Sequence, residues 1–260
     1  MTQAERGLPP LGVLGALTFL TRVPVRLRRA PDLAASVPWF PVVGGVIGVI
    51  VGALAAGLGE FVPISVAAAI AVITGVALTG AFHEDGLADL ADAMGGWTVE
   101  QRREILKDSR HGSYGVAALT SSIVLRIVCV ATLAPAAAFA GLVAAHALGR
   151  AGAVATMGVR AQPTETGLGA EYTSAVSPRR AALGVAGGVL IAVLATGWWA
   201  LPLAAAAAVA ALAVGLLARR ALGAITGDAL GAIEQVGECL VLVVVTGLAT
   251  RHPLWWTYPA

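Results

Sequence analysis

Charged residues are scarce in this sequence. Asp, Glu, Lys and Arg make up only 12% of its 260 residues, whereas 58% are hydrophobic and the mean hydropathy is +0.83. This composition excludes an ordinary soluble globular domain. The formal net charge of +2 is too small to indicate a polyanionic partner, and we therefore expect no nucleic acid among its ligands.

Cysteine is equally rare. Cys129 and Cys239 both fall inside apolar runs, so we interpret them as small buried hydrophobic side chains and not as a disulfide pair. No cysteine spacing typical of a metal site is present. The N-terminal residues lack the pattern of a cleavable secretory signal, and we expect the apolar runs themselves to direct membrane insertion.

Apolar runs of about 20 residues recur along the chain, which is the length that crosses the hydrocarbon core as a helix. We predict an all-α, polytopic integral membrane protein that forms one membrane-embedded domain over residues 1–260. Val13–Thr21 is apolar but short, and is interpreted as an interfacial or re-entrant segment. About seven spans are expected: Val37–Gly59, Phe61–Phe82, Ser113–Ala134, Ala136–Met157, Ala181–Leu201, Leu203–Ala218 and Asp228–Thr250.

The positive residues predict the orientation. With a cytoplasmic N-terminus, nearly every Arg and Lys outside the spans falls on the cytoplasmic side, and only Arg251 falls outside. Residues 83–112, 158–180 and 219–227 are then cytoplasmic loops, whereas the external connections are minimal. We therefore expect the functional site to face the cytoplasm.

The negative charge gathers in one short segment. His83–Asp92 holds four carboxylates within nine consecutive positions. If the segment is helical, Asp85, Asp89 and Asp92 lie at i, i+4 and i+7 and share one face. Like charges on one face repel, and a divalent cation with hard oxygen ligands, Mg²⁺ or Mn²⁺, is the compensation that we expect. A solvated acidic loop is the alternative interpretation.

Two other segments on the predicted cytoplasmic side combine small and polar residues. Lys107–Gly115 places cations and hydroxyls directly before an apolar run, as in an anion-binding loop, although interfacial anchoring explains its cations equally well. Thr226–Glu238 begins with a residue suited to a helix N-cap, Thr226 or Asp228, and then carries carboxylates into the membrane.

Carboxylates inside a span are costly and face a partner or a cavity. Glu234 and Glu238 are such residues, and their candidate partners are Arg126 and Arg150. His146 lies four residues before Arg150 on the same helical face, and Arg150 either snorkels to the interface or clamps a phosphate. These groups together predict a polar cavity that opens towards the cytoplasm.

Five segments, in this order along the chain, resemble the cobalamin synthase family, whose activity is adenosylcobinamide-GDP ribazoletransferase. The family commonly has Leu or a similar residue at the position of Glu84, so the sequence departs from its pattern there. Nearly the whole chain takes part in the resemblance. The segments are Phe19–Val25, Trp39–Gly44, His83–Asp92, Lys107–Gly115 and Thr226–Ala232.

The resemblance implies a single membrane-embedded catalytic domain that depends on Mg²⁺. A ribose hydroxyl of α-ribazole, or of its 5′-phosphate, attacks the cobinamide-linked phosphorus of adenosylcobinamide-GDP. GMP leaves, and a phosphodiester forms. Besides these small-molecule substrates and the lipid bilayer, the sequence leaves open a homo-oligomer or a complex with other late cobalamin-pathway enzymes.

Site residues follow as hypotheses. We assign the metal–diphosphate to Asp85, Asp89 and Asp92, with Glu84 or Asp228 as further ligands. The general base stays open between a carboxylate of the acidic segment, His83 and His111. The residues expected to bind substrate are Lys107, Asp108, Ser109, Arg110, Arg150 and Arg22.

Three other classes of membrane protein compete with this interpretation. A CDP-alcohol phosphotransferase shares the Asp-Gly pair but requires further motif residues that are missing here. An aromatic prenyltransferase normally has two comparable Asp-rich motifs, and the segment around Asp228 is a poor second copy. A transporter or channel would use Arg126, Glu234 and Glu238 to line a pathway, but the sequence shows no internal repeat and keeps its polar motifs on one side.

Overall fold

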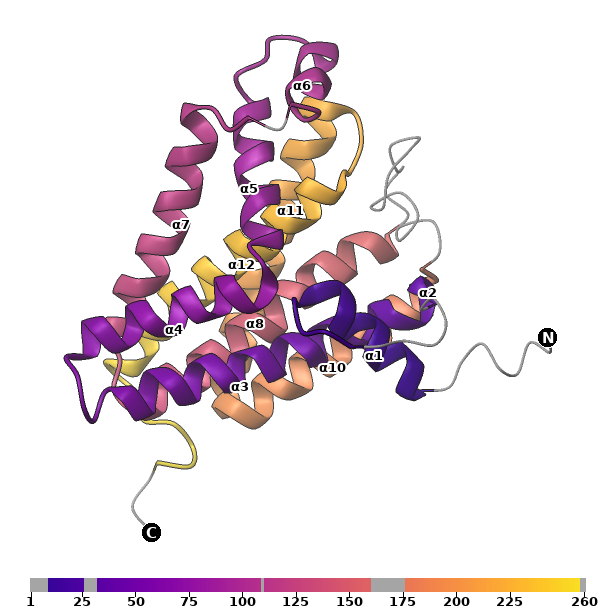
Figure 1. Ribbon diagram of the computed structural model, residues 1–260. Helices are drawn as coiled ribbons and strands as arrows, with labels where there is room; N and C mark the ends of the chain where they lie inside the picture. The colour runs from indigo at the N-terminus through magenta and orange to yellow at the C-terminus, as the bar shows by residue number, and fades with distance from the viewer. Residues whose placement is uncertain (1–8, 26–31, 109, 160–175, 258–260) are drawn as a thin grey trace.

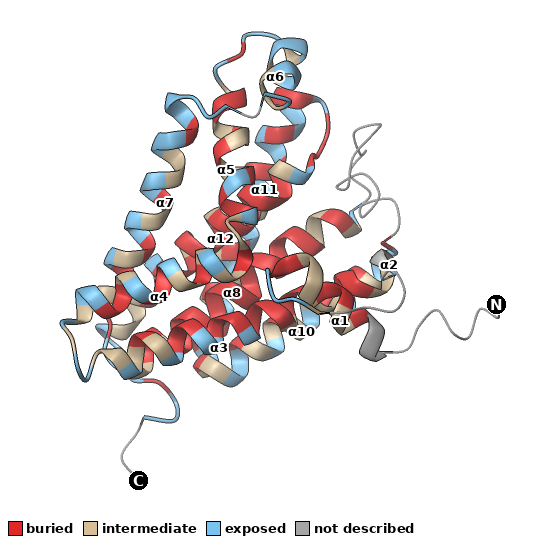
Figure 2. Ribbon diagram, viewed as in Figure 1, coloured by how far each residue is buried: buried red, intermediate tan, exposed pale blue. Residues whose placement is uncertain are grey.

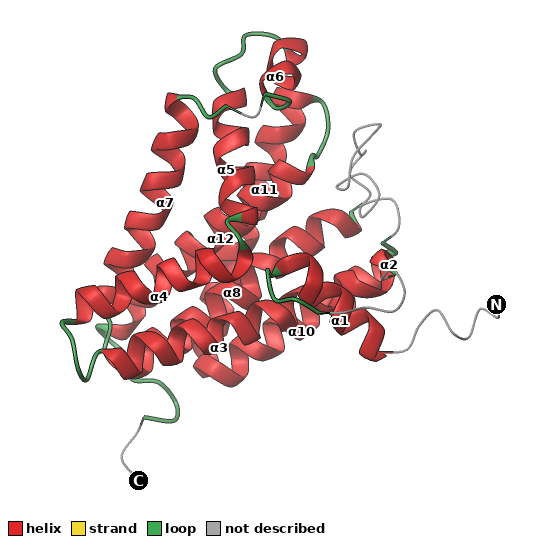
Figure 3. Cartoon of the chain, viewed as in Figure 1, coloured by secondary structure: helices red, strands yellow, loops and turns green. Residues whose placement is uncertain are grey.

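The structure, a computed structural model, describes residues 9–25, 32–108, 110–159 and 176–257. Figure 3 shows helices joined by loops, as the sequence predicted. The helices are α1 (Pro9–Leu20), α2 (Leu33–Ser36), the 3₁₀ helix η2 (Val37–Trp39), α3 (Phe40–Leu58), α4 (Ile64–Thr79), α5 (Phe82–Ala93), α6 (Val99–Ile105), α7 (Ser113–Ala131), α8 (Pro135–Gly158), α10 (Pro178–Thr196), the 3₁₀ helix η3 (Gly197–Trp199), α11 (Ala200–Leu222) and α12 (Gly227–Ala249).

Five helical stretches in the described residues are long and apolar enough to cross a membrane. This confirms a polytopic integral membrane protein. The short apolar segment near the N-terminus forms α1, whose 12 residues are too few for a crossing. The five stretches are Ala34–Leu58, Ser113–Ala131, Pro135–Gly158, Pro178–Leu222 and Gly227–Ala249.

The predicted number of about seven spans differs from these five for two reasons. The 45-residue stretch Pro178–Leu222 contains two helices, α10 and α11, which meet at Gly197, where φ is +62°. The predicted span Phe61–Phe82 contains α4, which has only 16 residues because the chain bends sharply after Thr79. Counting the bent pair α4 and α5 as one span raises the number to six.

The bend between α4 and α5 lies at Gly80 and Ala81, which both adopt left-handed conformations with φ of +65° and +58°. The two helix axes enclose 88°. In Figure 1, α5 turns away from the end of α4 and rises between α7 and α11. The acidic segment His83–Asp92 lies within α5, and the predicted loop 83–112 is therefore mostly helix, namely α5 followed by α6.

Helix α8 is the centre of the bundle, with 94% of its most apolar window buried (Figure 2). Helix α3 packs against it through glycines at four-residue spacing. A Cβ atom at Gly48 would lie 2.6 Å from the Cα of Val143, and one at Gly52 would lie 3.0 Å from the carbonyl oxygen of Phe139. Without side chains at these positions, the two backbones approach closely, as small-residue motifs allow in membranes.

Helix α6 connects the acidic helix to the end of α11. Thr98 and Gln101 form a capping box at its N-terminus. The guanidinium groups of Arg102 and Arg103 donate hydrogen bonds of 2.8–3.3 Å to the carbonyl oxygens of Ala221 and Leu222. These arginines satisfy the last carbonyl groups of α11 and fix α6 against its C-terminus.

Candidate functional site

The first turns of α12 pack directly on α5 through two glycines. A Cβ atom at Gly86 would lie 2.9 Å from the carbonyl oxygen of Asp228, and one at Gly231 would lie 3.2 Å from that of His83. Thr226 caps α12, because its hydroxyl accepts a hydrogen bond of 3.1 Å from the amide of Ala229. The glycines of the two polar segments thus bring those segments together, although the 133 residues 93–225 lie between them in the sequence.

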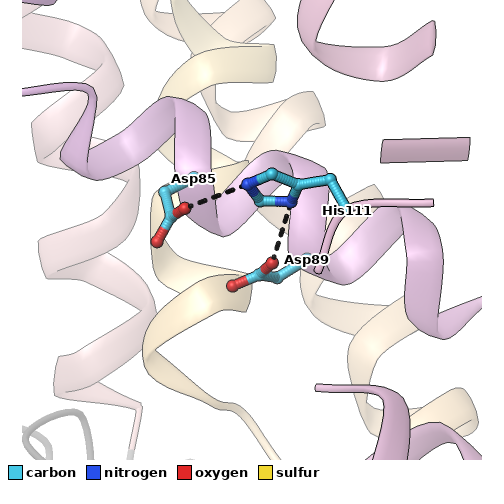
Figure 4. Close-up of side chains that lie close together, drawn as sticks. All are labelled: Asp85, Asp89 and His111. Carbon is cyan, nitrogen blue, oxygen red and sulfur yellow. Dashed lines mark ion pairs between the residues drawn. The ribbon is translucent and has the colours of Figure 1, made fainter. Parts of the chain in front are cut away.

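Two of the predicted metal ligands face one histidine at the surface of α5. In Figure 4, the imidazole ring of His111 lies between the carboxylates of Asp85 and Asp89. Its Nε2 atom is 3.6 Å from Oδ1 of Asp85, and its Nδ1 atom is 3.5 Å from Oδ1 of Asp89. One ligand atom from each residue lies within 4.8 Å of the others. We call Asp85, Asp89 and His111 the acidic group.

Asp228, in the first turn of α12, adds a third carboxylate close to the acidic group. Its charge repels those of Asp85 and Asp89. The side chain of Asp85 is 62% exposed and that of Asp89 is 22% exposed, so ligands from solution reach the group. The backbone of Asp228 packs on Gly86 between these two residues, although Asp228 is not among the three residues whose ligand atoms lie within 4.8 Å of one another.

Asp92 is placed differently from its two predicted companions. Its buried carboxylate accepts hydrogen bonds of 2.7 Å from the amide of Gly112 and 2.8 Å from the amide of Gly115. These amides lie at the N-terminus of α7, where backbone donors have no partner within the helix. Asp92 caps α7 in this structure, and both of its oxygens are engaged there.

We expect Asp92→Ala to lower the free energy of unfolding by about 0.5–2 kcal/mol, as the loss of a helix cap does. Asp92→Asn should cost less, because one oxygen still accepts a hydrogen bond. Chemical unfolding of the two variants in detergent, followed by circular dichroism, measures the difference. Equal stability of Asp92→Ala and the wild type would contradict the capping role.

Glu84 lies on the buried side of α5, away from the acidic group. Its Oε1 accepts hydrogen bonds of 2.9 Å from the guanidinium of Arg126 and 3.2 Å from the amide of Gln235. Arg126 also donates a hydrogen bond of 2.9 Å to Oε2 of Glu238. Glu84 therefore serves as the anchor of α5 to α7 and α12 in this structure, and it does not join the other proposed metal ligands.

Arg150 continues this network on the other side of Glu238. Its Nη1 atom lies 2.5 Å from Oε1 of Glu234 and 3.0 Å from Oε1 of Glu238. His146 contacts Glu238 as well. The ion pairs expected from the sequence are thus present, but their side chains are buried and pair with one another in the bundle interior. Arg150 neither snorkels nor reaches the acidic group.

The remaining predicted residues lie in three places. His83 is buried, with Nδ1 3.8 Å from Oε2 of Glu234. Lys107 is exposed in the loop before α7, and Ser109 lies outside the described residues. Asp108 and Arg110 form an exposed pair with an Nη2–Oδ2 distance of 2.6 Å, and the hydrogen bond from Arg110 lowers the pKa of Asp108 to about 2.

Arg22 lies at the bend between α4 and α5. Its amide donates a hydrogen bond of 2.8 Å to the carbonyl oxygen of Leu78. Its side chain covers Gly80, because a Cβ atom there would come within 2.7 Å of the Cγ of Arg22. Arg22 is exposed and lies beside the bend that precedes α5, the helix that carries the acidic group.

The profile of a family described as cobalamin-5-phosphate synthase matches residues 12–246. The chain belongs to this family. Three relatives, each named adenosylcobinamide-GDP ribazoletransferase, come from Bradyrhizobium diazoefficiens (40% identity), Chlorobaculum tepidum (39%) and Azorhizobium caulinodans (38%). The matches cover 88–91% of this chain and 90–96% of those relatives. No solved structure matches the chain.

Membership of the cobalamin-5-phosphate synthase family makes the chain a transferase of cobalamin biosynthesis. Sequence reasoning found the acidic group and the two arginines of the interior, but it missed two polar residues of the buried network. Gln235 donates to both Glu84 and Glu234, and Ser122 donates a hydrogen bond of 3.0 Å to Gln235. The signal for Gln235 was available, because it directly follows a carboxylate inside an apolar span.

Two clusters in the described residues could hold a metal, and of these the acidic group suits a divalent cation better. The buried cluster of His146, Glu234 and Glu238 already has the guanidinium of Arg150 against its carboxylates. A second cation there would meet like charge in a medium of low dielectric constant. The acidic group offers carboxylate oxygens to solution with no Arg or Lys paired to them among the described residues.

Proposed function

We propose that this chain acts as an adenosylcobinamide-GDP ribazoletransferase whose reaction takes place at the acidic group of α5. In this reaction, a ribose hydroxyl of α-ribazole or its 5′-phosphate displaces GMP from adenosylcobinamide-GDP. The observation that carries the proposal is the meeting of Asp85, Asp89 and His111 beside Asp228. Both substrates carry phosphate or hydroxyl groups that such a site can hold.

Mg²⁺, or Mn²⁺ in its place, would be held by Asp85, Asp89 and Asp228. Carboxylate oxygens are the ligands that these hard cations prefer, and few protein ligands suffice when a diphosphate supplies others. When bound, the cation would neutralise negative charge on the diphosphate and on the departing GMP. Asp92 accepts hydrogen bonds from two backbone amides, and Glu84 accepts one from Arg126. We therefore leave both residues out of this ligand set.

His111 is the general base that we favour. It lies next to the two carboxylates, where the hydroxyl of the acceptor would be activated, whereas His83 is buried against Glu234. In the transfer, the hydroxyl oxygen forms a bond to the cobinamide-linked phosphorus as the bond from that phosphorus to the GMP oxygen breaks. His111 takes the hydroxyl proton, and GMP leaves with the bonding electrons.

Lys107 and Arg110, on the loop that carries His111, would hold oxygens of the diphosphate. Both cations are exposed, and only Arg110 has an acidic partner, Asp108, among the described residues. A diphosphate is a stronger competitor for a guanidinium than a solvated carboxylate, because it carries two negative charges. Arg22, beside the N-terminus of α5, would add positive charge for the diphosphate. Ser109 would be a further hydrogen-bond donor to it.

We place the acidic group on the cytoplasmic side of the cytoplasmic membrane. Arg102 and Arg103 contact the end of α11, so they share that end of the molecule with Arg219 and Arg220, and positive residues mark the cytoplasmic side. Helix α12 begins beside the acidic group and runs for 23 residues, about 34 Å, away from it. Beyond its far end, the indole of Trp256 bonds Ala195, as expected at the opposite interface.

Removal of divalent metal should abolish the transfer. We expect purified protein in detergent, given adenosylcobinamide-GDP and α-ribazole, to release GMP and form cobalamin with Mg²⁺ and to form neither with EDTA. Mass spectrometry of both products measures the reaction, and added Mg²⁺ should restore it. Because detergent removes the two compartments, product formation also separates an enzyme from a transporter. Unchanged turnover in EDTA would refute the metal site.

A further inference from the structure

An apolar groove runs between α8, α10 and α11 and is not used by the proposed reaction. It encloses about 390 Å³. Leu148 and Gly152 of α8 form its floor, and Val185 and Val189 of α10 line one wall. Among the residues that the structure describes, its only polar lining side chains are Thr156, whose hydroxyl already donates to the carbonyl oxygen of Gly152, and one arginine.

The other wall is one face of α11, from Ala204 to Arg219. At 1.5 Å per residue, this wall is about 22 Å long, so the groove is elongated and suits a chain-like occupant. It is open at Gly215, one helical turn before Arg219, where an added Cβ atom would meet nothing within 4 Å. At its rim, Leu212 and Leu216 are 66% and 50% exposed, as expected of side chains that face lipid.

Arg219 stands at one end of the groove, in the last turn of α11. Its side chain is exposed and has no acidic partner among the residues that the structure describes. An occupant with hydroxyl or amide groups along its length would leave them unpaired against apolar walls, which is costly. The chemistry that matches a long apolar groove with one cation at its end is an acyl chain joined to an anionic headgroup.

We propose that this groove binds an anionic phospholipid, with an acyl chain along α11 and the headgroup phosphate at Arg219. The site is separate from the acidic group, and the proposal does not depend on the reaction assigned there. Lipid tails are as apolar as the side chains of the groove, so the acyl chain gains van der Waals packing there and no transfer out of water. The interaction of one arginine with an anionic headgroup adds about 1 kcal/mol.

Filling the groove tests the apolar part of the site. The protein is incorporated into nanodiscs of equal phosphatidylglycerol and phosphatidylcholine, and the lipids retained after release are identified by native mass spectrometry. Gly215→Leu should retain at least about tenfold less phospholipid than the wild type. Gly57→Leu is the matched control, because a Cβ atom at Gly57 also meets nothing within 4 Å but lies on α3, outside the groove. Ala208→Phe fills the groove from an exposed position and replaces Gly215→Leu if that variant does not fold.

Neutralising the arginine tests the headgroup. The wild type should prefer phosphatidylglycerol, and Arg219→Gln should lower that preference about fivefold, whereas Arg220→Gln, a neighbour outside the groove, should keep it. Equal retention by the wild type and the filled variants would overturn the proposal. So would a wild type that retains no phospholipid. A change of oligomeric state on filling, with retained lipid unchanged, would instead assign the groove to a second copy of the chain.

Discussion

Asp85→Asn and Asp89→Asn should each lower the turnover of the transferase by at least about a hundredfold at limiting Mg²⁺. Loss of a partner beyond the direct ligands already costs 10- to 100-fold in metal sites, and these two carboxylates would contact the cation. Each substitution keeps the size of the side chain and removes one negative charge. GMP release, measured over a range of Mg²⁺ concentrations, should show a raised half-activating concentration.

The control for both variants is Asp32→Asn. Asp32 is an exposed carboxylate at the start of α2, where it accepts a hydrogen bond of 3.3 Å from the amide of Ala35. This variant should keep wild-type turnover. If Asp85→Asn and Asp89→Asn are folded and retain normal turnover at limiting Mg²⁺, the acidic group does not hold the metal, and the assignment of Asp228 would fall with it.

Arg126→Met should lower the free energy of unfolding by about 3–5 kcal/mol, which is the usual cost of removing one partner from a buried ion pair. Arg126 is 4% exposed and bonds Glu84 on α5 and Glu238 on α12. Its loss leaves one oxygen of each carboxylate without its cation in the bundle interior. Unfolding by SDS in mixed micelles, followed by circular dichroism, measures the change.

A second substitution separates the loss of this ion pair from a simple loss of packing. Arg126→Met together with Glu84→Gln should recover part of the lost stability, because a neutral amide is less costly to bury than an unpaired carboxylate. Arg220→Met is the control, since its exposed guanidinium contributes less than about 1 kcal/mol at the end of α11. An Arg126→Met protein as stable as this control would show that the network carries little of the stability.

Helix α5 carries residues of both the acidic group and the buried ion-pair network. One side carries Asp85 and Asp89 towards solution, and the other side is held by the pairing of Glu84 with Arg126. Because Glu84 and Asp85 are adjacent, the network fixes the rotation of α5 and with it the direction of the acidic side chains.

The sequence by itself determined the class of the protein, its helical spans to within a few residues for most helices, and the segments that carry the polar chemistry. Apolar runs of membrane length leave the backbone no alternative to the helix, so these predictions need no tertiary information. The ion pairs of Glu238 with Arg126 and Arg150 also followed from the sequence, because a charge inside a span requires a partner.

Only the tertiary structure decided which carboxylates act together. Helical spacing placed Asp92 on one face with Asp85 and Asp89, but spacing cannot show that the N-terminus of α7 would arrive there and engage both of its oxygens. The close approach of Asp228 to α5 depends on two glycines far apart in the chain. The bend at Gly80 and Ala81 likewise turned an apparent loop into a helix. Such outcomes depend on contacts between distant segments, and local sequence patterns do not encode them.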